Sequence, residues 1–135
     1  MKSHIGAVAL LTIAFVWFPV HHTVDVEVKL KHPIRTKATT AEKKANQKMA
    51  IQFASVAYDW DKKQQACIVK LFMIESKFDH LAKNKEGSSA YGIAQMLNET
   101  SSDPAIQILR SYKYIKKRYS TPCKALAFHS RNNYY

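Results

Sequence analysis

An apolar stripe with a helical period runs through the middle of this 135-residue chain. Ile68, Leu71, Phe72 and Glu75 recur at i, i+3, i+4 and i+7, so all four are predicted to share one helix face. A carboxylate on an apolar face is costly unless it is paired or held neutral. Glu75 is therefore predicted to be functional, because a carboxyl group that stays protonated near neutral pH can act as a general acid.

Further helices are predicted around that stripe. Residues 41–57 are good helix formers, with an inner face expected at Met49, Phe53, Val56 and Ala57. The Glu75 helix is predicted to begin after Asp59 or Asp61, which can cap it, and to run to about Lys77. The segment 93–97 is short and apolar and is predicted to form one helical turn.

Two cap-plus-proline pairs mark the start of two more helices. Asp103-Pro104 and Thr121-Pro122 each place a capping side chain directly before a proline, which is favoured at the first helical position. The expected inner positions are Ile108, Tyr112, Ile115 and Tyr119 in the first helix, and Cys123, Leu126 and Ala127 in the second, which is predicted to end near Ser130. The predicted fold class is therefore all-α, over a compact domain of residues 42–135.

The N-terminal third has a different composition. Lys2 precedes an apolar run from Ile5 to Val20, which predicts a secretory signal over residues 1–22. It is either a signal peptide or an uncleaved signal anchor in the membrane: no pair of small residues marks a cleavage site, yet about 16 apolar residues fall short of a typical span. Residues 23–41 are predicted to be a linker or extended segment. We expect a protein exported to the periplasm or cell envelope.

The chain is strongly basic, with a formal net charge of +11. The excess is present in both halves, and it predicts attraction to a polyanion such as nucleic acid, anionic lipid or an anionic wall polymer. The charge alone does not choose among these partners, and no specific nucleic-acid motif occurs. A solvated helix face is the favoured interpretation of the bases between residues 110 and 118.

Two motifs after the stripe resemble those of a known family. They are Glu75-Ser76-Lys77-Phe78-Asp79 and, after a loop with Gly87-Ser88-Ser89, the segment Ala90-Tyr91-Gly92-Ile93-Ala94-Gln95-Met96. Their order and spacing resemble the lytic transglycosylase (SLT) domain of the lysozyme superfamily, in the compact form found in phages and some bacteria. The resemblance covers roughly residues 60–135. A third motif departs from the family pattern, because His129 and Ser130 stand where Tyr and Asn are common.

The resemblance implies a small lysozyme-like fold with a groove, and a site for peptidoglycan glycan strands. Glu75 would be the general acid and then base at the β-1,4 bond between N-acetylmuramic acid and N-acetylglucosamine, without metal or cofactor. Gln95 would bind substrate, Ser76 and Ser89 are candidates for bonds to the acid or the substrate, and Tyr91 and His129 are candidates for stacking on sugars. A non-catalytic wall-binding or structural module, and a hydrolysing lysozyme, are the alternatives; a phage protein of this type would be virion-associated.

The chain has two cysteines, Cys67 and Cys123. An even number in an exported chain favours a disulfide, which would tie the Glu75 helix to the last helix. Two buried free thiols are the alternative. Neither cysteine has a histidine at the spacing of a zinc site.

Overall fold

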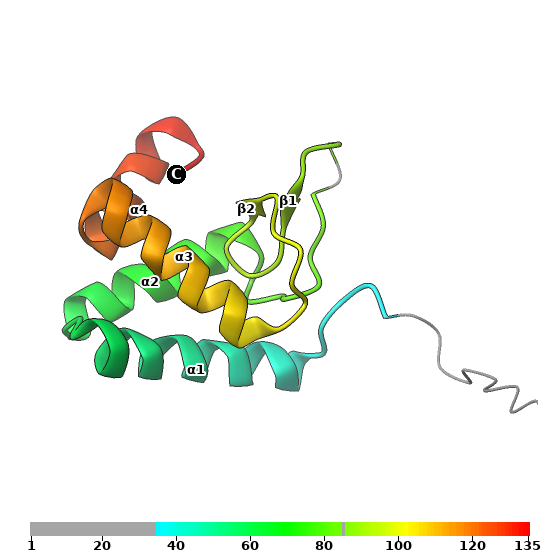
Figure 1. The fold of residues 1–135 in the computed structure, drawn as a ribbon, viewed down its shortest axis with the longest axis horizontal. Coiled ribbons are helices and arrows are strands. Elements are labelled where there is room, and N and C mark those ends of the chain that lie inside the picture. Colours follow the sequence, from blue (N-terminus) through cyan, green and yellow to red (C-terminus); the bar gives the residue numbers. More distant parts are fainter. Residues whose placement is uncertain (1–34, 85) are drawn as a thin grey trace, which may run out of the picture. The chain divides into compact units, whose positions relative to one another are not determined.

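The computed structural model describes residues 35–84 and 86–135. The predicted signal segment, residues 1–22, and most of the predicted linker lie outside the described residues. In the described part the order of elements is α1 (Thr40–Tyr58), α2 (Lys62–Glu75), β1 (Ala90–Tyr91), β2 (Met96–Leu97), α3 (Pro104–Tyr119) and α4 (Pro122–Asn132). Figure 1 shows α1 along the base of the domain, with the hairpin and α4 at opposite ends. No helix within these residues is long and apolar enough to cross a membrane.

The mostly helical architecture agrees with the predicted all-α class, with one addition. Strands β1 and β2 pair antiparallel, with Ala90 opposite Leu97 and Tyr91 opposite Met96. The segment predicted as a helical turn is instead a reverse turn that leads into β2. Gly92 and Gln95 both have positive φ, at 78° and 47°, which is incompatible with a right-handed helical turn.

Capping side chains set where the helices begin. Asp103 and Thr121 cap α3 and α4, each with proline in the first turn, as predicted. Asp61 caps α2 by accepting a hydrogen bond from the Gln64 N–H. The helix ends at Glu75, two residues before the predicted end, because Lys77 and Phe78 both adopt positive φ. This turn places the Glu75 side chain at the open end of α2.

The core lies between α1, α2 and α3. Ile68, Leu71 and Phe72 are fully buried, and so are Ile108, Tyr112 and Ile115, so the α2 stripe and most of the α3 stripe are confirmed. Tyr119 is only partly buried and packs against this cluster. The Tyr112 hydroxyl donates a hydrogen bond to the Ala50 carbonyl at 2.6 Å, which satisfies its polar end.

The predicted inner faces of α1 and α4 are partly wrong. Ala50 and Ala54 are the buried apolar residues of α1, whereas Val56 is 80% exposed and Ala57 is exposed. Met49 and Phe53 pack at the edge of the core. In α4 the buried alanine is Ala125, and Ala127 is exposed. In both helices a small side chain faces the core, which permits close approach of the neighbouring helices.

The predicted disulfide is present. Cys67 of α2 and Cys123 at the start of α4 are bonded, across 56 residues of sequence. The bond fixes the first turn of α4 against the middle of α2. It therefore helps to hold the two helices that carry the site.

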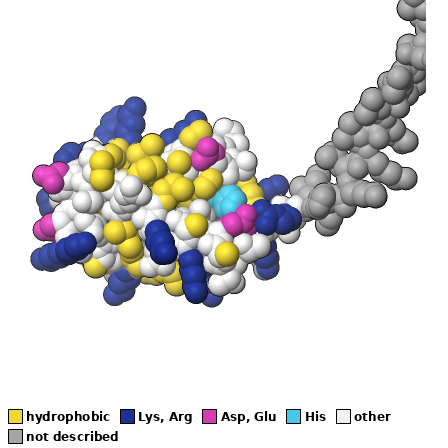
Figure 2. Space-filling model, turned by 90° about the horizontal axis from the view of Figure 1, so that it is seen from below, with side chains coloured by type: hydrophobic (Ala, Val, Ile, Leu, Met, Phe, Trp, Pro, Cys, Tyr) yellow, Lys and Arg dark blue, Asp and Glu magenta, His cyan; other side chains and the backbone are white. Residues whose placement is uncertain are grey.

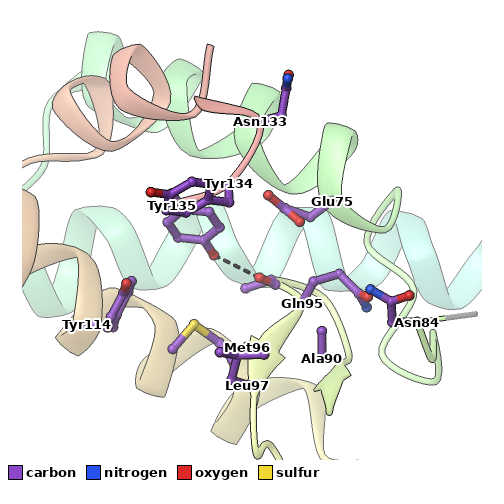
Figure 3. Close-up of a pocket in the computed structure, with 11 residues that line it drawn as sticks. Glu75, Asn84, Ala90, Gln95, Met96, Leu97, Tyr114, Asn133, Tyr134 and Tyr135 are labelled. Carbon is purple, nitrogen blue, oxygen red and sulfur yellow. Dashed lines mark hydrogen bonds between the residues drawn. The ribbon is translucent and has the colours of Figure 1, made fainter. Parts of the chain in front are cut away.

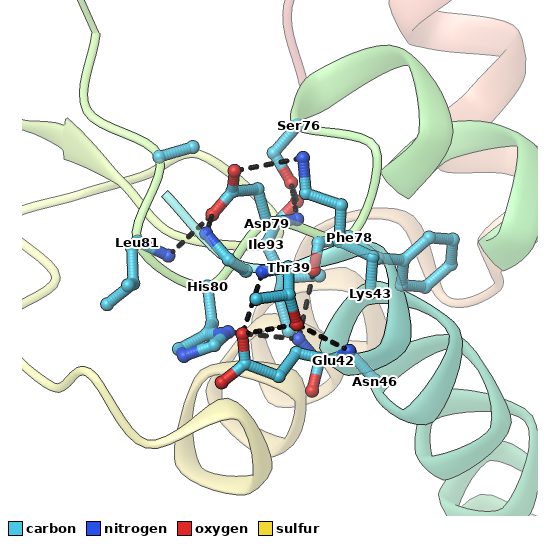
Figure 4. Close-up of polar contacts among 12 residues, drawn as sticks. Thr39, Glu42, Lys43, Asn46, Ser76, Phe78, Asp79, His80, Leu81 and Ile93 are labelled. Atoms are coloured by element: carbon cyan, nitrogen blue, oxygen red, sulfur yellow. Dashed lines mark hydrogen bonds and ion pairs between the residues drawn. The ribbon is translucent and has the colours of Figure 1, made fainter. Parts of the chain in front are cut away.

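A buried polar cluster fastens the long segment between α2 and α3 to the helices (Figure 4). The Asp79 carboxylate accepts from the N–H groups of Ala38 and Leu81 and pairs with Lys43 at 3.0 Å. The side chain of Asn46 donates to the Phe78 carbonyl. Burial by itself raises the pKa of Asp79, but these hydrogen bonds and Lys43 together hold it below its usual range. Residues just before α1 thus already belong to the folded unit.

Seen from the α1 side, hydrophobic side chains collect in the middle of the face, and Lys and Arg side chains lie around its edge and across its lower part (Figure 2). Acidic side chains are few on this face. The arrangement agrees with the basic composition of the chain.

Candidate active site

Glu75 lies in a groove of about 680 Å³ between the end of α2, the hairpin and the C-terminal residues (Figure 3). The groove is lined by Glu75, Asn84, Ala90, Ala94, Gln95, Met96, Leu97, Tyr114, Asn133, Tyr134 and Tyr135. The Glu75 side chain is only 15% exposed. Burial raises the pKa of Glu75 to about 7, so a large share of the carboxyl groups is protonated at neutral pH.

His129 of α4 is the partner of this carboxyl group. Its Nε2 atom lies 3.0 Å from Glu75 Oε1, and the residue is buried. At this distance the Nε2–H tautomer of the imidazole can donate to Oε1, which leaves Oε2 free to carry the acidic proton. His129 does not line the groove, so its ring is not placed for the predicted stacking on a sugar.

Gln95 also lines the groove and lies across it from Glu75 (Figure 3). Its Nε2 group donates to the carbonyls of Ala82 and Gly92, at 3.1 and 2.8 Å. Within the described residues its Oε1 atom has no hydrogen-bond donor, so it can accept one from a ligand hydroxyl or amide. The side chain is therefore held by the backbone with its acceptor free.

The turn that carries Gln95 depends on Gly92. This glycine has a φ of 78°, and a Cβ atom added to it would overlap the side-chain amide of Gln107. Gln107 is buried at the start of α3; it accepts from the Ile93 N–H at 2.9 Å and donates to the carbonyls of His80 and Ser101. The two residues together fix the position of the turn relative to α3.

The other predicted binding residues, Ser76, Ser89 and Tyr91, do not line the groove. Ser76 donates to the Ile93 carbonyl at 2.7 Å and accepts from the Asp79 N–H, so it fastens the loop and does not contact the acid. Ser89 accepts from the Asn98 N–H across the hairpin. Ser89 and Tyr91 line a separate depression of about 450 Å³, which shares Asn84 and Ala90 with the groove.

Sequence reasoning missed the aromatic wall of the groove, formed by Tyr114, Tyr134 and Tyr135. Tyr114 and Tyr135 lie 6.0 Å apart between ring centroids. The Tyr135 hydroxyl donates to the Ala94 carbonyl at 2.9 Å, and burial raises the pKa of Tyr135 well above its usual range. The only available signal was the Asn-Tyr-Tyr sequence after the last helix, which has no periodicity to place it.

The groove combines one buried acid, an opposed amide and aromatic side chains. Among the described residues that line it, Glu75 is the one carboxylate, and none is Lys or Arg. In the described part of the chain, no group of three or more His, Cys, Asp or Glu residues is arranged to hold a metal ion. Aromatic faces with a few fixed polar groups suit an uncharged, hydroxyl-rich ligand such as a sugar chain. Comparison with protein-family models, curated proteins and solved structures finds no match for this chain.

Proposed function

We propose that this protein is a lytic transglycosylase of peptidoglycan, with Glu75 as its general acid and base. The observation that carries the proposal is the state of Glu75. Burial raises its pKa to about 7, and it is the one carboxyl group among the described residues that line the groove. A protonated acid at neutral pH suits proton donation to a glycosidic oxygen. The family resemblance of the two motifs, with Gln95 opposite the acid, supports the same reaction.

In this reaction Glu75 donates its proton to the oxygen that leaves C1 of N-acetylmuramic acid, and the C1–O bond breaks. The acetamido group of the same sugar stabilises the positive charge at C1, which makes a second protein carboxylate unnecessary. The Glu75 carboxylate then accepts the proton of the C6 hydroxyl as its oxygen bonds to C1. A 1,6-anhydro end forms without water, and the acid is restored.

Each nearby side chain has a role in this scheme. His129 donates to Oε1 of Glu75 and orients the carboxyl group, so that Oε2 faces the scissile bond. On the side of the groove opposite Glu75, the Oε1 atom of Gln95 accepts a hydrogen bond from the bound glycan strand. The rings of Tyr114, Tyr134 and Tyr135 provide apolar faces for the pyranose rings.

The test is mass spectrometry of purified sacculi digested by the wild type and by Glu75→Gln. We expect anhydro-muropeptides from the wild type and a loss of about 10²–10⁴-fold in their rate of release by the variant. Glu86→Gln is the matched control, because Glu86 is exposed and lies outside the groove. Reducing ends would indicate a hydrolysing lysozyme, and binding to sacculi without any product would indicate a wall-binding module.

A further inference from the structure

The positive charge of the folded domain is concentrated in its last two helices. Residues 104–135 contain seven Lys or Arg residues and no Asp or Glu, whereas residues 61–103 contain six of each sign. All seven are exposed: Arg110, Lys113, Lys116, Lys117, Arg118, Lys124 and Arg131. Of these, Arg110 alone pairs with a carboxylate of the described residues, Glu99. The other six, here called the cationic margin, form no ion pair within residues 35–84 and 86–135.

The cationic margin includes a shallow depression of about 450 Å³. It is lined by Arg118, Tyr119, Lys124, Ala127, Phe128 and Arg131, which come from the end of α3 and from α4. Three cations thus surround an aromatic floor. Such a depression concentrates positive potential and attracts an anion more strongly than a scattered set of surface lysines.

Aromatic rings that line this depression pack against aromatic rings that line the groove. Tyr119 and Phe128 line the depression, and Tyr134 and Tyr135 line the groove. Tyr119 lies 6.4 Å from Tyr135 and Phe128 lies 5.4 Å from Tyr134, between ring centroids. The two hollows are therefore neighbours on the protein, and a side branch of a polymer in the groove has the cations close by.

Arg118 lines the depression and also lies close to a residue of the groove. Its guanidinium carbon lies 5.6 Å from the ring centroid of Tyr119 and 6.0 Å from that of Tyr114, which lines the groove. Its Nε group donates to the Tyr119 hydroxyl. The terminal nitrogens have no acceptor within the described residues, so they present the fork that suits a carboxylate.

We propose that the cationic margin binds the carboxylates of the peptide stems carried by the glycan strand in the groove. This inference rests on the proposed function, since it takes the occupant of the groove to be peptidoglycan. The described residues that line the groove include no Lys or Arg, so none of them pairs with the charged groups of the stems. The cations of the cationic margin supply this charge. The guanidinium group of one of them, Arg118, lies beside Tyr114, which lines the groove.

Co-sedimentation with glycan, with every protein carrying Glu75→Gln so that no strand is cut, separates this interaction from catalysis. The variant is Arg118→Gln, Lys124→Gln, Arg131→Gln, and its control is Lys44→Gln, Lys48→Gln, Lys70→Gln, which removes the same charge from exposed positions of α1 and α2. One substrate is sacculi with intact stems, and the other is the glycan strands that an amidase releases from the same sacculi, immobilised on beads because they are soluble without their stems. The first triple variant loses three exposed ion pairs of ordinary strength. We therefore expect it to bind intact sacculi about tenfold more weakly than the control variant does.

The expected result is that this tenfold difference disappears on stripped glycan. Equal binding of the two triple variants to intact sacculi would overturn the proposal, and so would an equal loss on stripped glycan. A loss that appears only with a phosphodiester polymer or with vesicles of anionic lipid would assign the margin to that partner instead. Because binding is measured without turnover, an inactive wild type would refute the proposed reaction and leave this result readable.

Discussion

The two walls of the groove are built in different ways. The wall that carries Glu75, here called the helix wall, consists of the ends of α2 and α4. These helices are joined by the Cys67–Cys123 disulfide and packed through apolar side chains. The opposite wall, here called the loop wall, is a loop that contains the short hairpin of β1 and β2. It is held mainly by the buried polar side chains of Asp79, Asn46 and Gln107. Apolar packing tolerates small shifts, whereas a buried hydrogen bond is lost when its geometry fails. We therefore expect the loop wall to be the more sensitive to a single substitution.

The largest effect is expected from Gly92→Ala in the loop wall. The new methyl group would displace the Gln107 amide, and alanine at a φ of 78° is strained. Strain and lost buried hydrogen bonds together should lower the free energy of unfolding by about 3–5 kcal/mol. Thermal denaturation followed by circular dichroism measures this.

Gly87→Ala is the matched control for that substitution. Gly87 has a similar φ, 82°, but nothing lies within 4 Å of the position its Cβ would occupy. Only the conformational cost remains, so we expect a loss of about 1–2 kcal/mol. Equal losses for the two variants would show that the Gly92–Gln107 contact does not hold the loop.

A smaller effect is expected when the disulfide of the helix wall is removed. Replacing Cys67 and Cys123 together with serine should lower the free energy of unfolding by about 2–4 kcal/mol, because the unfolded chain gains freedom. The four helices should persist at low temperature, since the apolar stripes remain. Urea denaturation in the presence and absence of a reductant measures the same difference in the wild type. A reduced wild type as stable as the oxidised protein would contradict the prediction.

The helices of this protein could be predicted from the sequence only where the signal is local or periodic. Helix starts at Asp103 and Thr121 are local signals, and the stripe through Ile68 and Leu71 is periodic, so both were found correctly. On α1 the choice of large apolar residues failed, because close packing selected Ala50 and Ala54, and Val56 points to solvent. A sequence pattern does not record which small residue a neighbouring helix approaches.

The candidate site was predictable in part for similar reasons. Glu75 and Gln95 belong to contiguous motifs, and the structure places both on the groove. The pairing of His129 with Glu75 joins residues 54 positions apart, and the polar cluster around Asp79 joins it to Ala38, 41 residues earlier. Such contacts have no period and no motif. Burial of a polar residue is set by its partners, which only the tertiary structure identifies.

His129→Phe is the finest test of the helix wall, because it removes one hydrogen bond at the site and keeps an aromatic ring of similar size. Without the Nε2–H donor the carboxyl group of Glu75 loses its orientation, and we expect the rate of anhydro-muropeptide release to fall about 10–100-fold.

The pH profile distinguishes this role from a merely structural one. Because the proposed reaction requires a protonated Glu75, the wild-type kcat/KM should fall as the pH rises through about 7. Removing a donor to the carboxylate disfavours the ionised form, so in His129→Phe the pKa of Glu75 should rise and the fall should move to higher pH. His129→Gln, which keeps a donor at nearly the same reach, should recover part of the rate and return the fall toward pH 7. A lower rate with an unchanged pH profile in both variants would mean that His129 only packs α4 against α2.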